Sequence, residues 1–194
     1  MKYLSFMSRD RFVQRKTAVL SKLDKSSIGE WDRKIKKLCE KINNLQDFYT
    51  TSSCSGRAIL MIQQDKKEND LFLKVWHEKI SFNELKKALI GIVKIKNIIK
   101  FKLEPPIIHV ACMDMKKATE MLEKAKYIGF KRSGLLTFDR NIILELNTSE
   151  RMEFPIISKG KIIVDDEFLR LIVSMSNQKM QKWWEKITKL EKSV

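Results

Sequence analysis

Strand-length apolar segments recur along this chain of 194 residues, but helical segments do not alternate with them one by one. A doubly wound parallel sheet needs a helix between successive strands. The chain contains only six glycines and neither a G-x-G-x-x-G nor a G-x-x-x-x-G-K pattern. These features favour an α+β fold with a mixed, largely antiparallel sheet flanked by helices. They disfavour a Rossmann-type cofactor domain and a P-loop.

Apolar spacing predicts where the elements lie. Strand-like runs occupy residues 48–51, 58–63, 71–76, 99–103, 107–113, 135–138, 142–146 and 152–157. Helical spacing predicts two N-terminal helices, the second from about Trp31 to Leu45, and a long C-terminal helix from about Asp165 to Lys192. The expected inner stripe of the long helix is Phe168, Ile172, Met175, Trp183, Ile187 and Leu190.

Two shorter helices have clear start signals. Ser81 and Glu84 have the spacing of a capping box, and Asp114 precedes a helical pattern that ends near Gly129. No Gly/Ser-rich linker, repeat or low-complexity tract divides the chain. We therefore expect a single domain over residues 1–194.

The charge is strongly unbalanced. Lysine and arginine number 39 against 24 aspartates and glutamates, which gives a formal net charge of +15. Adaptation to high temperature explains many charges of both signs but not a surplus of one sign. A basic surplus attracts polyanions, because each neutralised phosphate releases counterions. The composition therefore predicts a nucleic acid partner, and charge alone does not separate RNA from DNA.

Hydropathy and cysteine usage exclude several classes of protein. No apolar run reaches the roughly 20 residues of a membrane-spanning helix, and the first residues lack the apolar region of a secretory signal. We expect a cytoplasmic protein without membrane contact. Cys39, Cys54 and Cys112 form no C-x-x-C pair, and only two histidines are present. We therefore expect neither a disulfide framework nor a metal site.

The most unusual stretch runs from Thr50 to Arg57, between two apolar strands. Five hydroxyl-bearing residues and a thiol precede Gly56 and Arg57. Hydroxyls, backbone N–H groups and a glycine that tolerates positive φ suit a ligand-binding turn, and a guanidinium suits a carboxylate or a phosphate. The alternative is a hairpin loop of ordinary turn-forming residues. The residues alone leave both interpretations open.

Three other residues are candidates for acid–base chemistry. Asp24 follows the first helix, although a lone aspartate in a turn is more often a cap. His77 follows a strand, and His109 lies within an apolar run. Imidazole titrates near neutrality, so either histidine is a candidate general base. A structural histidine is the alternative for each.

The C-terminal helix carries a basic face. Lys179, Lys182 and Lys186 follow each other at steps of three and four residues, and Trp183 lies among them. Lysines beside an aromatic ring suit single-stranded RNA, whose phosphates meet lysines while unstacked bases lie on rings. The alternative is a solvated lysine face with a tryptophan in the core.

Several segments, in order along the chain, carry a family pattern. They are Phe12–Lys16, Leu23–Ser26 with Gly29, Tyr49–Arg57, Phe101–Pro105, Ile108–Cys112, Gly129–Gly134, Lys159–Lys161 and Ser176–Lys179. Through these segments the chain resembles the tRNA wybutosine-synthesizing protein 3 family over about residues 9–190. Ile28, Arg132 and the pair Asn147 and Thr148 depart from the pattern.

The resemblance implies an S-adenosylmethionine-dependent tRNA methyltransferase without a Rossmann fold. The implied substrate is the N-4 nitrogen of 7-(3-amino-3-carboxypropyl)-4-demethylwyosine, at position 37 in the anticodon loop of phenylalanine tRNA. The chain positions that match the family pattern include Asp24, Ser53, Ser55, Gly56, Arg57, His77, His109, Asn177 and Lys179.

These matches lead to three groups of expected site residues. We expect the cofactor to be bound by Ser52, Ser53, Ser55, Gly56, Arg57 and His109. We expect Asp24 or His77 to remove the ring-nitrogen proton. We expect RNA to be bound by Lys179, Lys182, Trp183 and Lys186. Two rival classes are a non-catalytic RNA-binding module acting on tRNA or the ribosome, which needs no cofactor, and a small-molecule enzyme, which needs no tRNA affinity.

Overall fold

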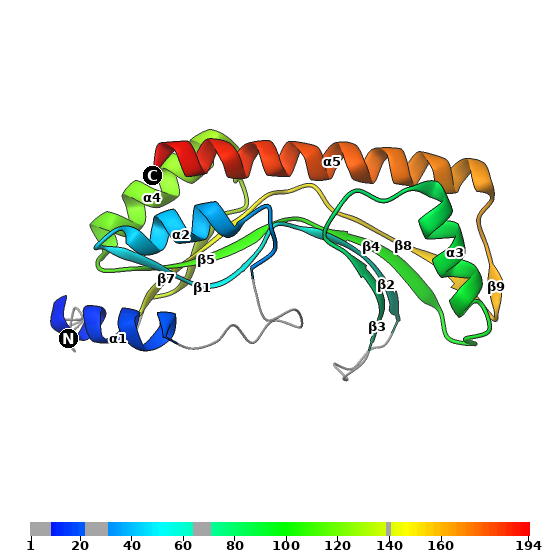
Figure 1. Cartoon of the computed structure of the whole chain (residues 1–194), viewed down its shortest axis with the longest axis horizontal. Helices are drawn as coiled ribbons and strands as arrows, with labels where there is room; N and C mark the ends of the chain where they lie inside the picture. The colour runs from blue at the N-terminus through cyan, green and yellow to red at the C-terminus, as the bar shows by residue number, and fades with distance from the viewer. Residues whose placement is uncertain (1–8, 22–30, 64–70, 139–140) are drawn as a thin grey trace. The chain divides into compact units, whose positions relative to one another are not determined.

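The computed structural model describes residues 9–21, 31–63, 71–138 and 141–194 (Figure 1). Asp24, Leu23, Ile28 and Gly29 lie outside these residues. The chain divides into two compact units. Unit 1 takes Met1–Ser55, Pro106–Ser149 and Trp184–Val194, and unit 2 takes Gly56–Pro105 and Glu150–Trp183. The expectation of a single domain stays a prediction.

Unit 1 contains a four-stranded antiparallel sheet. Its spatial order is β1 (Phe48–Cys54), β5 (Ile107–Cys112), β7 (Ile142–Asn147) and β6 (Gly134–Thr137). Helices α2 (Lys36–Asn44) and α4 (Met115–Ile128) lie on one face of this sheet, and α1 (Arg9–Leu20) lies on the other (Figure 1).

Alternation along the strands decides what each face of unit 1 buries. Ile108 and Leu146 are opposite each other and fully buried on the face that α2 and α4 cover. On the other face, Phe12 of α1 packs on Tyr49 with ring centroids 5.2 Å apart, and both contact Ala111. Within the described residues, α2 and α4 therefore lie on one face of the sheet and α1 on the other.

Unit 2 contains a five-stranded antiparallel sheet. Its order is β3 (Phe72–Trp76), β2 (Arg57–Ile62), β4 (Ile99–Glu104), β8 (Met152–Ser158) and β9 (Lys161–Ile162). Helix α3 (Phe82–Ile92) belongs to this unit, as does the first part of α5 (Asp166–Ser193). Phe154 of β8 contacts both Phe101 of β4 and Phe168 of α5, with ring centroids 5.5 and 5.4 Å away. Aromatic packing thus joins the long helix to the sheet.

The α+β class, the antiparallel pairing and the long C-terminal helix are confirmed. The described strands form two sheets rather than one, and every pairing among them is antiparallel. The hairpin interpretation of the hydroxyl-rich stretch is wrong. Strand β1 pairs with β5 and β2 pairs with β3 and β4, so Ser55 and Gly56 connect two different sheets.

The expected helix signals are present. Ser81 and Glu84 form a complete capping box at the start of α3. The Asp114 side chain accepts a hydrogen bond from the backbone N–H of Lys117, and α4 ends at Gly129 with φ of 120°. The second N-terminal helix begins later than predicted, at Lys36. A turn precedes it, in which the backbone N–H groups of Ile35 and Lys36 donate to the Asp32 carbonyl.

The buried stripe of α5 differs from the prediction at two positions. Phe168 and Met175 are 36% and 41% exposed, whereas Leu169, Val173 and Met180 are buried. The prediction followed one apolar row on the helix. The core instead selects a neighbouring row, since side chains one position apart differ by about 100° around the helix. No helix among the described residues is long and apolar enough to cross a membrane.

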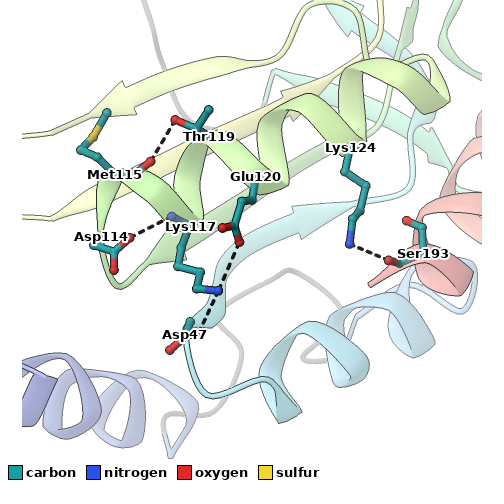
Figure 2. A network of polar contacts seen from close by, with 8 residues as sticks. All are labelled: Asp47, Asp114, Met115, Lys117, Thr119, Glu120, Lys124 and Ser193. Atoms are coloured by element: carbon teal, nitrogen blue, oxygen red, sulfur yellow. Dashed lines mark hydrogen bonds and ion pairs between the residues drawn. The ribbon is translucent and has the colours of Figure 1, made fainter.

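Part of the lysine surplus has a structural role in unit 1. Lys124 of α4 donates to the carbonyl oxygen of Ser193 at 2.6 Å (Figure 2). Lys41 of α2 donates to the carbonyl oxygen of Glu191 at 2.6 Å. The last carbonyls of a helix have no intrahelical partner and carry partial negative charge. These two lysines therefore stabilise the C-terminal end of α5.

Candidate functional site

Gly56, which lies between β1 and β2 in the chain, has a backbone conformation that favours glycine. Its φ is +96°, and it is buried. A Cβ atom at this position would lie 2.7 Å from Cε3 of Trp183 and 3.1 Å from the carbonyl oxygen of Glu104. Only glycine fits both the φ angle and this close approach. The expectation of a glycine with positive φ in this stretch is confirmed.

Arg57 follows at the start of β2 and is held in a fixed plane. Its Nε donates to Oε2 of Glu104 at 2.9 Å, and its guanidinium lies 5.0 Å from the ring centroid of Phe72. Lys102 approaches the other carboxylate oxygen of Glu104 at 2.8 Å. Two cations therefore share one anion, and the cluster keeps a net positive charge for a carboxylate or phosphate ligand.

The two cations also set the charge state of Glu104. Burial by itself would raise the pKa of this carboxyl, but the hydrogen bond from Lys102 and the charge of Arg57 outweigh burial, so its pKa is lowered. Glu104 is consequently ionised at neutral pH. Among the described residues, Arg57 has no hydrogen bond through its terminal Nη atoms, which suit a ligand.

The serines of β1 point to different surroundings. Ser52 is exposed and lies opposite His109 of β5. Ser53 lies opposite the core residue Ile108, on the face that α2 covers. Ser55 is fully buried, and its backbone N–H donates to Oδ2 of Asp32 at 2.7 Å. Unit 1 therefore brings only Ser52 beside His109.

His109 makes a short contact across the sheet. Its Nε2 lies 3.0 Å from Oε2 of Glu145, the residue directly opposite on β7. Asn147, two residues further along β7, donates from Nδ2 to Oε1 of Glu145 at 3.4 Å. His109 and Glu145 are half-buried, with 23% and 33% of their side chains exposed. His109, Glu145 and Asn147 thus form a polar group on the sheet face where Tyr49 and Ala111 pack against α1.

The buried thiols take no part in this chemistry. Burial raises the pKa of Cys39 to about 12, although the neighbouring Ser53 hydroxyl acts in the opposite direction. Burial likewise raises the pKa of Cys112 to about 12. Both side chains are therefore neutral thiols at physiological pH and poor nucleophiles.

His77 lies in unit 2, directly after β3, and is half-buried. The turn that follows it is fixed by Asn177 of α5. The Asn177 amide accepts from the backbone N–H of Ile80 at 2.9 Å and donates to the carbonyl oxygen of the same residue at 2.8 Å. Asn177, which matches the family pattern, therefore holds the backbone between β3 and α3.

The four residues expected to bind RNA differ in exposure. Lys182 is exposed, and Lys179 and Lys186 are half-buried. Trp183 is fully buried, and its indole N–H donates to Oε2 of Glu150 at 3.4 Å. The Trp183 ring also lies where a side chain at Gly56 would be. Trp183 is therefore a core residue in this structure, with no ring face exposed for a base.

Sequence reasoning missed three carboxylates of the candidate site. Asp32, Glu104 and Glu145 each accept hydrogen bonds from an expected site residue or its backbone. One signal was present, because Glu145 alternates with Ile143 and Asn147 along a strand and therefore shares a face with them. The strand register that places Glu145 opposite His109 was not readable from the chain.

Comparison with known proteins identifies the family. The model of the family described as Methyltransferase TYW3 matches residues 14–194. The chain belongs to the TYW3 methyltransferase family. It is 37% identical over 166 residues to a protein of Archaeoglobus fulgidus named tRNA(Phe) 7-((3-amino-3-carboxypropyl)-4-demethylwyosine(37)-N(4))-methyltransferase, with 84% of this chain and 82% of the relative covered. A protein of Thermococcus sibiricus with the same name is 34% identical and covers 94% of this chain and 93% of its own length.

Solved structures agree with this membership of the TYW3 family. The structure of the PH1069 protein from Pyrococcus horikoshii superposes with a TM-score of 0.86 at 30% identity, covering 95% of this chain and 96% of that one. A hypothetical protein from Aeropyrum pernix shares the fold with a TM-score of 0.72 at 24% identity, covering 84% of this chain and 96% of that one. The family resemblance and the absence of a Rossmann-like arrangement are therefore confirmed. A methyltransferase family implies a methyl donor.

Proposed function

We propose that this protein transfers a methyl group from S-adenosylmethionine to the N-4 nitrogen of 7-(3-amino-3-carboxypropyl)-4-demethylwyosine in phenylalanine tRNA. The observation that carries the proposal is the match of the TYW3 family over residues 14–194, together with archaeal relatives named for this reaction. The geometry of Gly56 and Arg57 supports the proposal. Both residues belong to the Tyr49–Arg57 segment that carries the family pattern, and both have a constrained conformation rather than that of a solvent-exposed loop.

Unit 1 offers groups that fit the methyl donor. S-adenosylmethionine carries an amino group, a carboxylate and two ribose hydroxyls, all of which need hydrogen-bond partners when buried. Ser55 Oγ, Thr148 Oγ1 and Asn147 Oδ1 are buried and have no hydrogen-bond partner among the described residues. Buried oxygens without partners are costly, and a polar ligand would satisfy them. We propose these three groups, with Ser52 and Ser53, as cofactor contacts of unit 1.

Unit 2 offers a cation for a carboxylate. The proposed substrate base and the cofactor each carry an amino-acid group. Arg57 has its plane fixed by Glu104 and Phe72, so little side-chain freedom is lost when a carboxylate binds. We propose that Arg57 binds one of these two carboxylates. The cofactor supplies a methyl group on a positively charged sulfur, and the protein contributes alignment, worth up to roughly 7–11 kcal/mol in favourable cases.

For tRNA binding we retain three of the four predicted residues. Lys179, Lys182 and Lys186 share one face of α5 at spacings of three and four residues. We propose that they contact phosphates of the anticodon arm. Trp183 is left out because its ring is buried. Asp24 and His77 stay predictions as proton acceptors.

Methyl transfer can be tested directly. Purified protein is incubated with S-adenosylmethionine and phenylalanine tRNA from a strain that lacks this enzyme, and the tRNA nucleosides are analysed by mass spectrometry. We expect one added methyl group on the wyosine precursor. Arg57→Ala should reduce turnover at least tenfold while far-ultraviolet circular dichroism stays unchanged. Arg151→Ala, an exposed arginine of the same unit, is the matched control for loss of one positive charge.

The test has two informative failures. If the wild-type protein adds no methyl group, the proposed function is refuted. If methyl transfer occurs but Arg57→Ala and Arg151→Ala are equally active, the function stands and the role of Arg57 does not. Titration with tRNA at rising salt provides a further measurement, because several phosphate contacts should weaken binding by orders of magnitude between low and moderate salt.

A further inference from the structure

One row of side chains crosses the sheet of unit 1 on the face that α1 only partly covers. Ser52 of β1 lies opposite His109 of β5, His109 opposite Glu145 of β7, and Glu145 opposite Gly134 of β6. Residues that face each other across antiparallel strands project from the same side of a sheet. The four positions therefore share one face, and the strands that carry them lie side by side (Figure 1).

The contact between His109 and Glu145 fixes how the imidazole is protonated. A carboxylate can only accept hydrogen bonds, so the ring nitrogen that faces it, Nε2, must carry the proton. The distance is 3.0 Å. In the neutral ring the other nitrogen, Nδ1, then holds a lone pair. Among the described residues, no hydrogen bond reaches Nδ1 of His109, so this lone pair is available to accept a proton.

Glu145 is itself held in place. Its Oε1 accepts from Nδ2 of Asn147 at 3.4 Å, and Asn147 is only 2% exposed. The arrangement is a chain of three side chains in which an almost fully buried amide orients a carboxylate and the carboxylate orients an imidazole. In serine hydrolases a carboxylate bonded to one ring nitrogen likewise keeps a histidine in the tautomer whose other nitrogen accepts a proton.

The face beside this chain has room for a ligand. A Cβ atom built at Gly134 would meet no atom within 4 Å among the described residues. Ser52, at the other end of the row, is exposed. Helix α1 packs over the neighbouring row, where Phe12 contacts Tyr49 and Ala111. His109 and Glu145 therefore border space that the described side chains leave open.

We infer that His109, in place of the predicted Asp24 or His77, is the general base of the methyl transfer and that Glu145 is its positioning residue. This inference rests on the proposed function, because N-4 of the demethylated base carries a hydrogen that must leave when the methyl group arrives. The nitrogen–carbon bond forms as the sulfur–carbon bond breaks, and the sulfonium becomes a neutral thioether. The N-4 proton moves to Nδ1 of His109, and the positive charge ends on an imidazolium paired with Glu145.

A purely structural ion pair is the competing explanation. Cross-strand pairs of opposite charge are common and stabilise sheets modestly. Such a pair would contribute to unfolding stability and would select the same imidazole tautomer, but its loss would not lower kcat while leaving KM for tRNA unchanged. The experiment must therefore contain a measurement that a structural role leaves unchanged.

The first measurement needs neither cofactor nor tRNA. The chain has two histidines, so nitrogen-15 spectra of the imidazoles contain two sets of signals, which His77→Gln assigns. In the wild-type protein above neutral pH, we expect His109 to be almost wholly in the form with the proton on Nε2. In Glu145→Gln we expect at least a threefold fall in the ratio of this form to the other tautomer. Equal tautomer ratios in the two proteins would overturn the positioning role.

The second measurement separates turnover from binding. His109→Gln should lower kcat for methyl transfer by about 10²–10⁴-fold with KM for tRNA changed less than threefold. Glu145→Gln should lower kcat at least tenfold, and Glu145→Asp, which keeps the carboxylate, should recover part of the loss. An inactive wild-type protein would refute the proposed function and this inference together. An active wild type with His109→Gln equally active would refute only this inference.

A third pair of variants tests the open face. Gly134→Leu places a side chain beside Glu145, and Gly91→Leu places the same side chain in open space on α3 of unit 2. We expect at least a tenfold loss of kcat/KM for Gly134→Leu and no loss for Gly91→Leu, with both proteins folded. Equal activity of the two variants would show that the substrate does not use this face.

Discussion

The replacement of Gly56 by alanine tests whether the positive φ and the close approach of Trp183 restrict this position to glycine. Alanine at φ of +96° adopts a sparsely populated backbone conformation, which costs about 1–3 kcal/mol. The new Cβ would lie 2.7 Å from Cε3 and 3.0 Å from Cζ3 of Trp183, a ring that is fully buried and cannot move without displacing its neighbours. Such overpacking costs about 1–3 kcal/mol.

The two costs are partly offset in the unfolded chain. Alanine restricts the unfolded state more than glycine does, which returns about 0.4–1 kcal/mol. We therefore expect Gly56→Ala to lower the free energy of unfolding by about 2–5 kcal/mol. For a chain of this length each kcal/mol shifts Tm by about 2–4 °C, so the expected fall is roughly 4–20 °C. Circular dichroism at 222 nm during heating measures it.

Two other glycines provide matched controls. A Cβ at Gly91 or at Gly134 meets nothing within 4 Å, and neither residue has positive φ. Gly91→Ala should raise stability by about 0.5–1 kcal/mol, because alanine is the better helix former. Gly134→Ala should change it by less than about 1 kcal/mol. If Gly56→Ala unfolds at the wild-type temperature, the close approach of Trp183 does not constrain this position and the reasoning fails.

Two further predictions concern stability. Asp114→Ala should lower the free energy of unfolding by about 1 kcal/mol, because the Asp114 side chain accepts a hydrogen bond from the backbone N–H of Lys117 at the start of α4 (Figure 2). Asp114→Asn should keep most of this stability. Equal losses for the two variants in chemical denaturation would contradict the capping role. The pKa of Glu104 in the folded protein lies below its value of about 4.3 in the unfolded chain. The contacts of Glu104 with Arg57 and Lys102 therefore stabilise the fold above about pH 4.3. This stabilisation is lost as the pH falls through the pKa of the folded protein. The stability gap between wild type and Glu104→Gln in urea should therefore narrow from pH 7 to pH 3, and a constant gap would refute the assignment.

The hydroxyl-rich stretch from Thr50 to Arg57 shows that composition does not predict the direction in which each side chain points. Ser52, Ser53 and Ser55 were grouped because they are neighbours in the chain, but strand alternation turns Ser52 toward His109 and Ser53 toward the core. Ser55 lies in the connection between the sheets and is buried. Residues that are adjacent in a strand cannot share a face, unless a bulge intervenes. The three serines therefore have different surroundings, and their role as cofactor contacts stays a proposal.

The burial of Trp183 in α5 was likewise not predictable from its neighbours in the sequence. Trp183 lies between Lys182 and Lys186, and a helix repeats about every 3.6 residues. Its position in the sequence alone allows either solvent or core. The structure selects the core, because the ring packs on Gly56 and the indole N–H reaches Glu150. The lysines keep their place on the helix surface, since their charges are costly to bury.

The sequence alone determined the α+β class, most element positions and the caps at Ser81 and Asp114, because periodicity and capping are local properties of the backbone. The sequence also indicated the family, because the segments that carry the family pattern occur in order along the chain. Only the tertiary structure decided that Glu145 faces His109, that Glu104 holds Arg57, and that the strands form two sheets. These pairings join residues 36 and 47 positions apart, and such long-range register depends on the packing of the whole sheet rather than on any local pattern.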